Sequence, residues 1–521
     1  MANTWKYTPV IDIIENVIKI NKNDLTGRGV KVLKKFLFLL VALMLVLVGC
    51  STTNPSLKDT WLNAVNQTSS EAKLTLSADV NVDGMNLTDE QKKIAELFQD
   101  GFVIEQKAQD EKNVYMKITA NNDQPLRDLG VWTAKEKAAA EMLVKENVMY
   151  FKTSADPFFF KVDMDELNDQ DFNMQSQYEM QQKVMEFMKG EFKNYIEQYN
   201  YEMPKLQDLG FKTIETPAGK EDVLKVKYEL GINEVLDFAE YTVDNLANYE
   251  RLDVFVKEFA GFMPTEVQPT EAEINTAVTE AKTQLGQFKA MLSGMTEESL
   301  EAMIGKDIDF KISTEVGISK KKYIASENTV INIGIKDPVT GENGSAVIKA
   351  TSLVWNVNGD VKLPEVKDAV NVTEYEKDIN KIRSLPDDTP IKKLFLQEFN
   401  ALFTIGQPFA ILGSDFQELD AAPYIKNGST MVPVAVIGEW LDSETKWDAK
   451  TNQVTMKVNN TEIKLTLGSK DAYVNGKKVI MHTAAESVNG RTFVPVAFIA
   501  KELGAKSEYN AQTQEVKIYF E

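Results

Sequence analysis

The chain has 521 residues, of which 43% are hydrophobic and 26% charged, values typical of globular protein. This length exceeds one ordinary hydrophobic core, so we expect two to four domains. The formal net charge of −20 argues against nucleic-acid binding, which depends on Lys and Arg neutralising phosphates. The single cysteine, Cys50, excludes an internal disulfide, and with only one histidine, His482, it also excludes a closed Cys/His zinc site.

An export signal lies near the N-terminus. A cationic segment precedes an uninterrupted apolar run over 36–48, and small residues and Cys50 follow it. The run has 13 residues, which is too short to cross a bilayer comfortably as a mature helix. This order of charge, apolar run and small residues is typical of a cleaved export signal. The cationic residues are Lys31, Lys34 and Lys35.

This layout resembles a bacterial lipoprotein signal peptide, with Leu47, Val48, Gly49 and Cys50 as the lipobox. The resemblance implies that Cys50 becomes the mature N-terminus and carries a thioether-linked diacylglycerol. Two acyl chains hold a protein at a membrane far better than one, at about 0.8 kcal/mol per buried methylene. We therefore expect a lipid-anchored protein on the extracytoplasmic face of a Gram-positive cell membrane. The alternative is a buried apolar helix that ends in Gly-Cys by coincidence.

Residues 1–29 stand before this signal, although a signal peptide normally begins the chain. We expect translation to start at Val30 or Val32, from an alternative start codon, rather than at Met1. Residues 1–49 then carry no mature function. Behind the lipidated cysteine, residues 50–56 are expected to form a short polar tether.

The segment 57–370 predicts an α+β region of antiparallel strands and long helices. It resembles, in architecture only, the curved half-barrel of the lipoprotein-carrier (LolA-like) group, and no motif extends the resemblance to function. The expected helices cover 57–66, 171–203, 233–259 and 271–292, and the expected strands cover 73–82, 102–108, 113–120, 147–154, 223–230, 309–318, 322–335 and 345–357.

Four methionines mark the predicted helix that begins near Phe172. Thioethers can bind Cu(I), or line a pliable apolar pocket for a lipid. The interpretation we favour is a core-facing stripe in which methionine fills gaps. The four residues are Met174, Met180, Met185 and Met188.

An acidic stretch over 163–171 could be a calcium-binding loop. An EF-hand loop beginning at Asp163 requires Gly at its sixth position and Glu at its twelfth, where Asn168 and Met174 stand. We therefore expect a solvated loop that caps the following helix.

A helical linker over 371–404, marked by Pro386 and Pro390, leads to an internal repeat. Segments 424–458 and 486–520 align without a gap, with 12 of 35 positions identical, so the C-terminal part is built from two related units. Each unit reads as a hairpin with an Asn-Gly turn, a short helix that starts at proline, and a second hairpin. The motif residues are Asn427, Gly428, Val432 and Pro433 in the first unit, and Asn489, Gly490, Val494, Pro495 and the helix-ending Gly504 in the second.

These residues resemble the copper amine oxidase N-terminal-like module, or stalk domain, over about 405–521, with units at about 405–458 and 463–521. The sequence departs from the family at Ala435 and Ala497, where the family often has Arg, and at Asp442, which replaces the helix-ending glycine. The oxidase activity itself requires three copper-binding histidines, and this chain has one. His482 also aligns with Asp420, so its position does not require an imidazole. The resemblance implies a spacer or docking module.

The sequence contains no glycine-rich phosphate loop, no His-Glu-x-x-His and no Gly-x-Ser-x-Gly. We expect a non-catalytic surface lipoprotein without a cofactor, held at the membrane by lipid, with cell-wall polymer or envelope proteins as candidate partners. One alternative is a carrier or sensor of a lipid or other apolar ligand, which requires an apolar cavity open to solvent in the middle region. The other is a cell-wall polymer hydrolase, which requires two carboxylates about 5–9 Å apart in a cleft.

Overall fold

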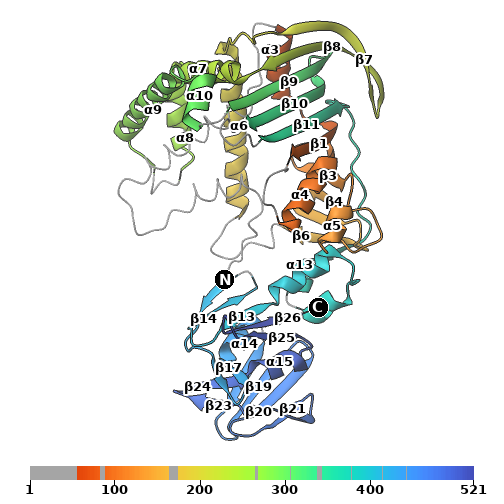
Figure 1. Cartoon of the computed structure of the whole chain (residues 1–521), viewed down its shortest axis with the longest axis vertical. Helices are drawn as coiled ribbons and strands as arrows, with labels where there is room; N and C mark the ends of the chain where they lie inside the picture. Colours follow the sequence, from red (N-terminus) through yellow and green to blue (C-terminus); the bar gives the residue numbers. More distant parts are fainter. Residues whose placement is uncertain are drawn as a thin grey trace. The chain divides into compact units, whose positions relative to one another are not determined.

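The computed structural model describes residues 55–81, 88–163, 174–263, 268–304, 307–336, 343–376, 378–413, 415–441 and 443–520 (Figure 1). The chain divides into two compact units. Unit 1 comprises Met1–Asp128, Met142–Met149 and Asp163–Glu365, and unit 2 comprises Leu129–Glu141, Tyr150–Val162 and Val366–Glu521. Helices and several sheets occur together, which confirms the predicted α+β, multi-domain class.

The largest sheet has twelve strands in the order β12-β6-β5-β4-β3-β2-β1-β11-β10-β9-β8-β7. The register places strands β1–β3 and β7–β11 antiparallel to their neighbours, whereas β12 runs parallel to β6. The strands are β1 Ser70–Asn81, β2 Phe102–Ala108, β3 Asn113–Ala120, β4 Ala139–Lys145, β5 Val148–Thr153, β6 Phe159–Asp163, β7 Gln207–Thr216, β8 Gly219–Leu230, β9 Asp307–Ser319, β10 Ile324–Lys336, β11 Asn343–Trp355 and β12 Ala369–Asn371.

Five helices of unit 1, α3 and α6–α9, pack around a core rich in aromatic side chains, in which Tyr195, Tyr199 and Leu252 are almost fully buried. None of the described helices is long and apolar enough to cross a membrane. The helices are α3 Pro55–Ala64, α4 Asp89–Asp100, α5 Gln124–Asp128, α6 Met174–Gln198, α7 Ile232–Ala247, α8 Leu252–Ala260, α9 Glu271–Leu292 and α10 Glu297–Ile304.

Two of the predicted helices differ from the structure at their ends. The helix expected to reach residue 203 ends at Gln198, because the backbone N–H of Asn200 donates to the Tyr241 hydroxyl at 3.0 Å instead of continuing the helix. The helix expected over 233–259 is two helices, α7 and α8. The amide side chain of Asn248 donates to the carbonyl of Asp244 at 2.9 Å and so closes the end of α7.

Unit 2 contains three short helices, α11 Thr373–Glu376, α12 Ile379–Ser384 and α13 Pro390–Glu398, within the segment expected as a helical linker. Their apolar residues belong to the same core as the C-terminal strands. The Lys392 ammonium is buried there and donates to the carbonyls of Arg383 and Leu385 and to the Asp387 carboxylate, at 2.6–3.0 Å. Arg383 in turn donates to the carbonyls of Leu503 and Gly504.

The C-terminal strands form three small antiparallel sheets, which we name sheet M1 (β15-β14-β13-β26-β25), the central sheet (β16-β17-β24-β23) and sheet M2 (β18-β19-β20-β21-β22). Two helices connect them, α14 Val434–Trp440 and α15 Val496–Glu502. The strands are β13 Ala401–Thr404, β14 Phe409–Leu412, β15 Asp415–Glu418, β16 Tyr424–Lys426, β17 Ser429–Pro433, β18 Glu444–Asp448, β19 Gln453–Val458, β20 Thr461–Thr466, β21 Asp471–Val474, β22 Lys477–Ile480, β23 Glu486–Val488, β24 Arg491–Pro495, β25 Lys506–Asn510 and β26 Glu515–Tyr519.

The two sequence repeats exchange strands. Each element from β13 to β19 has a counterpart 62 residues later, from β20 to β26. Sheet M1 joins β13, β14 and β15 of the first copy to β25 and β26 of the second, and sheet M2 joins the complementary strands. In the central sheet Val432 pairs with Val494, its own counterpart, so the two copies meet about a pseudo-twofold axis at that pair. Both valines are fully buried.

The hairpin turns follow the predicted chemistry. Asn427 and Gly428 have φ of 47° and 75°, and Asn489 and Gly490 have φ of 51° and 75°. Positive φ at both central residues is the geometry that Asn-Gly favours in two-residue hairpin loops. Gly504 follows α15 at φ 78°.

Candidate functional site: an apolar sheet face in unit 1

One face of the large sheet in unit 1 is apolar across many strands. Directly paired residues of antiparallel strands lie on the same face, so the register defines that face. One row runs from Val226 through Val316, Glu327 and Ser352 to Leu74, Ile104 and Ile118, across seven neighbouring strands. The residues of β1 that alternate with these are polar, including Lys73, Thr75 and Ser77.

The helical core of unit 1 covers only the β8–β9 end of this face. Val226 and Val316 are buried there as members of that core. Over β1, β2, β3, β10 and β11 the apolar residues belong to neither core cluster of the described chain. They are half-buried, except Ile118, which is 38% exposed. These residues are Leu74, Leu76, Phe102, Ile104, Met116, Ile118, Ile331, Ile333 and Ile348; we name them the open apolar face.

Helix α4 lies against β1 at the border of the open apolar face. The ring of Phe98 contacts that of Phe102 edge-on, with centroids 5.7 Å apart. Gly101 ends the helix at φ 74°, and a Cβ there would lie 1.9 Å from the Leu76 carbonyl oxygen. Only glycine permits this approach of helix and strand. Ile94 and Phe98, one turn apart on α4, are both exposed and extend the apolar surface.

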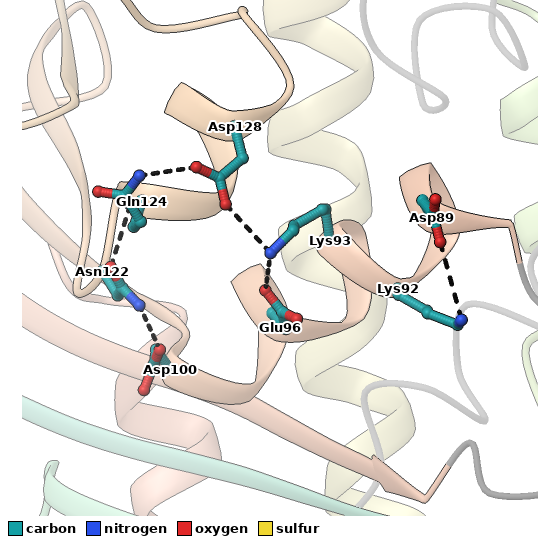
Figure 2. A network of polar contacts seen from close by, with 8 residues as sticks. All are labelled: Asp89, Lys92, Lys93, Glu96, Asp100, Asn122, Gln124 and Asp128. Atoms are coloured by element: carbon teal, nitrogen blue, oxygen red, sulfur yellow. Dashed lines mark hydrogen bonds and ion pairs between the residues drawn. The ribbon is translucent and has the colours of Figure 1, made fainter.

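A polar network holds the other side of α4 to the segment that follows β3 (Figure 2). The Lys93 ammonium bridges Glu96 at 2.9 Å and Asp128 at 3.0 Å, and Gln124 donates to Asp128 at 2.7 Å. The hydrogen bonds from Gln124 and Lys93 lower the pKa of Asp128. Asn122 also donates to Asp100 at 2.8 Å. Because these charges are paired with one another, we interpret the network as structural.

The predicted methionine helix is α6, and its methionines do not all face a core. Met180 and Met185 are 40% and 48% exposed, which differs from the core-facing stripe that we favoured. Met188 packs partly against the helical core, and Met174 is the first residue of α6, with its side chain outside the described residues. Lys189, one turn after Met185, forms an ion pair with Glu111 in the β2–β3 turn. Helix α6 therefore reaches that turn and adds apolar surface on the same side of the helix.

A polar group interrupts the face between its covered and open parts. The hydroxyls of Thr314 and Thr329 lie 3.0 Å apart, and the Thr329 hydroxyl donates to the Glu327 carboxylate at 3.0 Å. Glu327 and Thr329 occupy the same face as Leu74 and Leu76. A ligand with an apolar body and a hydrogen-bonding head would find both kinds of partner on this face.

Two buried carboxylates in the described part of the chain were considered as candidate catalytic acids. Glu191 is buried among Arg251 and Tyr249, and although burial raises its pKa, the hydrogen bonds from both residues leave it below the ordinary value. Among the described carboxylates, Asp156 has a raised pKa, caused by burial, and it accepts hydrogen bonds from the backbone and hydroxyl of Thr153 in a tight turn of unit 2. We found no cluster of three or more His, Cys, Asp or Glu residues suited to a metal ion within the described ranges.

The predicted site residues elsewhere lie as follows. Several of these residues fall outside the described part of the chain: Cys50 and the rest of the lipobox, Asp442, and all of the acidic stretch except its first residue, Asp163. The exposed imidazole of His482 lies 2.9 Å from the carbonyl oxygen of Asn427, in the turn of the other copy. Its counterpart Asp420 likewise reaches across to Arg491, at 2.6 Å. Both positions thus tie one copy to the hairpin turn of the other.

A comparison with protein families assigns part of unit 2. Residues 411–518 match the family model of the copper amine oxidase N-terminal domain. This segment is a copper amine oxidase N-terminal domain. The match covers about a fifth of the chain, and the strand exchange that completes the domain begins ten residues earlier, at Ala401 of β13. No curated protein matches the chain.

Proposed function

We propose that the protein is a non-catalytic lipoprotein of the cell envelope that carries or senses an apolar ligand on the open apolar face of unit 1. The observation that carries this proposal is the half-exposed state of that face, with the exposed side chains of Ile94 and Phe98 on α4 at its border. Soluble proteins rarely expose apolar surface over several adjacent strands without a binding role. The curved half-barrel of the LolA-like carriers is the architecture we propose for this part of the chain.

The anchor predicted at Cys50 places unit 1 near lipid. Pro55, where α3 begins, is the fifth residue after Cys50. An extended chain of that length spans about 17 Å, so unit 1 stays close to the membrane surface. Lipid-derived molecules are the apolar ligands available there. The copper amine oxidase N-terminal domain then serves as a docking or spacer module toward wall polymer or envelope proteins.

The test is native mass spectrometry of the chain from Ser51, which keeps every described residue, purified from its own host. We expect a co-purifying lipid-sized mass that organic extraction removes. Ile104→Glu places a charge among Leu74 and Ile118 on the open apolar face and should abolish the bound mass. Val103→Glu is the matched control, because this neighbour is also half-buried but lies on the opposite face.

Thermal unfolding of both variants checks that each remains folded. A clean protein mass in the unmodified chain would contradict the proposal. Equal retention of ligand by folded Ile104→Glu and Val103→Glu proteins would contradict the assignment to this face.

A further inference from the structure

Two hollows lie at one end of the large sheet, and they share Trp355. The first has a volume of about 720 Å³ and is lined by the β7–β8 and β9–β10 hairpins and by residues 354–359. The second, of about 280 Å³, is lined by the ends of β1, β2 and β3 and by Pro364. Trp355, the last residue of β11, lines both.

The walls of the first hollow are fixed by hydrogen bonds. The amide of Asn358 donates to the Tyr323 hydroxyl at 2.8 Å and accepts from the backbone of Thr68 at 2.8 Å. The amide of Asn356 donates to Glu71 at 3.2 Å, which joins this wall to the residues around the second hollow. The site is therefore held in shape by its own side chains.

Three residues at or next to the first hollow have a strained backbone. Lys322, Asn356 and Asn358 have φ of 63°, 54° and 54°, in the left-handed region that non-glycine residues seldom adopt. Such residues cost free energy and cluster at ligand-binding and functional sites. Asn356 and Asn358 line the first hollow together with Trp355, and Lys322 lies in the chain between two of its lining residues, Lys321 and Tyr323.

The charges around the hollows are largely paired with one another. Lys320 lies 3.3 Å from Asp222, and Lys107 lies 3.4 Å from Glu71. The hydrogen bonds from Thr213 and Lys320 also lower the pKa of Asp222, so this carboxylate stays ionised. A strongly charged polymer would have to break these pairs. A neutral ligand rich in hydroxyl and amide groups would instead hydrogen-bond to them while it stacks on the indole.

The two hollows together span the strand ends from β8 to β3. Seven neighbouring strands about 4.8 Å apart cover roughly 29 Å, which exceeds the length of any single sugar or amino acid. An extended peptide ordinarily binds by adding to a sheet edge, whereas these hollows lie across strand ends in the middle of the sheet.

We propose that the hollows form one binding site for a neutral polysaccharide chain that crosses Trp355. This site is separate from the open apolar face and does not depend on its ligand. The polysaccharide lies in both hollows, with the faces of its sugar rings against the indole and its hydroxyl groups against the polar walls.

The probe is a series of β-1,4-linked N-acetylglucosamine oligomers, from the dimer to the hexamer, titrated calorimetrically into the chain from Ser51. We expect affinity to rise with oligomer length until both hollows are filled. Trp355→Ala should weaken binding of the hexamer at least tenfold, and Lys321→Ala in the first hollow and Lys117→Ala in the second should each weaken the hexamer more than the dimer.

Trp447→Ala is the matched control, because Trp447 is a partly exposed tryptophan of the C-terminal domain and should leave binding unchanged. Circular dichroism confirms folding of each variant. Absence of binding, affinity independent of length, or an unaffected Trp355→Ala protein would overturn the proposal. So would preferential binding of an extended peptide of matched length. Repeating the titration with lipid-extracted protein keeps this result distinct from the test of the apolar face.

Discussion

Sheets M1 and M2 of the C-terminal domain are built on the same plan but present different surfaces. Their inner faces are equivalent: Phe403 and its counterpart Leu465 are both buried in the common core. Their outer faces differ. Leu402, Ile411 and Phe416 lie in one row on M1, where M2 carries Lys464, Tyr473 and Lys478.

This difference separates what the fold requires from what it leaves free. The inner positions must be apolar in both copies, because each sheet takes strands from both copies and closes one shared core. The outer positions have no such constraint, so duplication allowed them to diverge. The four tests below examine whether the inner faces and the turns of the two copies are equivalent, whether the copies meet at the pseudo-twofold axis, and whether the outer faces are free to differ.

The largest effect is expected in the shared core. Phe403→Ala should lower the free energy of unfolding by about 3–5 kcal/mol, and Leu465→Ala by about 2–5 kcal/mol, because each leaves a cavity beneath its sheet. Since both sheets depend on both copies, each variant should unfold the domain in one transition. Chemical denaturation followed by circular dichroism and by tryptophan fluorescence would show this, and separate transitions for M1 and M2 would contradict a shared core.

The paired turns should respond equally to loss of glycine. Gly428→Ala and Gly490→Ala should each cost about 1–2 kcal/mol, because both residues have φ of 75° and an alanine is strained there. A Cβ at either position meets no atom within 4 Å, so the cost comes from the backbone alone. Gly286→Ala in α9 is the control and should stabilise the chain by about 0.5–1 kcal/mol. Unequal costs at the two turns would break the equivalence.

The contact between the two copies at the pseudo-twofold axis can be tested through the pH dependence of the free energy of unfolding. Tyr424 and Glu486 are counterparts, and the Tyr424 hydroxyl donates to the Glu486 carboxylate at 2.6 Å. The ion pair with Lys426 and this bond lower the pKa of Glu486 from its ordinary 4.5, so the stabilisation is complete above pH 4.5 and is lost as pH falls through the folded-state value. Glu486→Gln should therefore cost about 1 kcal/mol at pH 7 and progressively less below pH 4.5. Urea denaturation across that range measures it, and a cost that grows on acidification would contradict the assignment.

The smallest effect is expected on the outer faces. Phe416→Lys copies the residue that M2 carries at Lys478, and Phe416 is 65% exposed. We expect a change in the free energy of unfolding of less than about 0.5 kcal/mol. A loss of several kcal/mol in urea denaturation would show that the outer face of M1 is constrained after all.

The sequence predicts local features of this protein better than long-range ones. Strands β2 and β3 and helix α9 have the expected boundaries, because alternation and capping residues mark them directly. The Asn-Gly turns and the hairpin–helix–hairpin order of each copy are also confirmed. The exchange of β13–β15 between copies was not predicted. These strands share few residues with β20–β22, and pairing across the domain leaves no periodic signal.

The open apolar face was missed for a related reason. Leu74, Leu76 and Ala78 alternate along β1 as in any half-buried strand. In the described part of the chain these residues join neither core cluster, and this depends on where the helices pack, which the local pattern does not encode. Trp355 belongs to no motif recognised in the sequence, and its place between two hollows follows only from the packing of the β9–β10 hairpin and the start of β1 around it.

The strand exchange also sets the order in which this domain can assemble. Sheet M1 pairs β13, at Ala401–Thr404, with β26, whose last residue is Tyr519. Contacts this distant in sequence form slowly, because the entropy of closing a long loop is lost before the strand pairing contributes any stabilisation. Strand β13 therefore stays without its second-copy partner until β26 has been synthesised. A chain that lacks β25 and β26 presents β13 with an unpaired, apolar edge that proteases can attack, whereas a chain that contains them can close sheet M1.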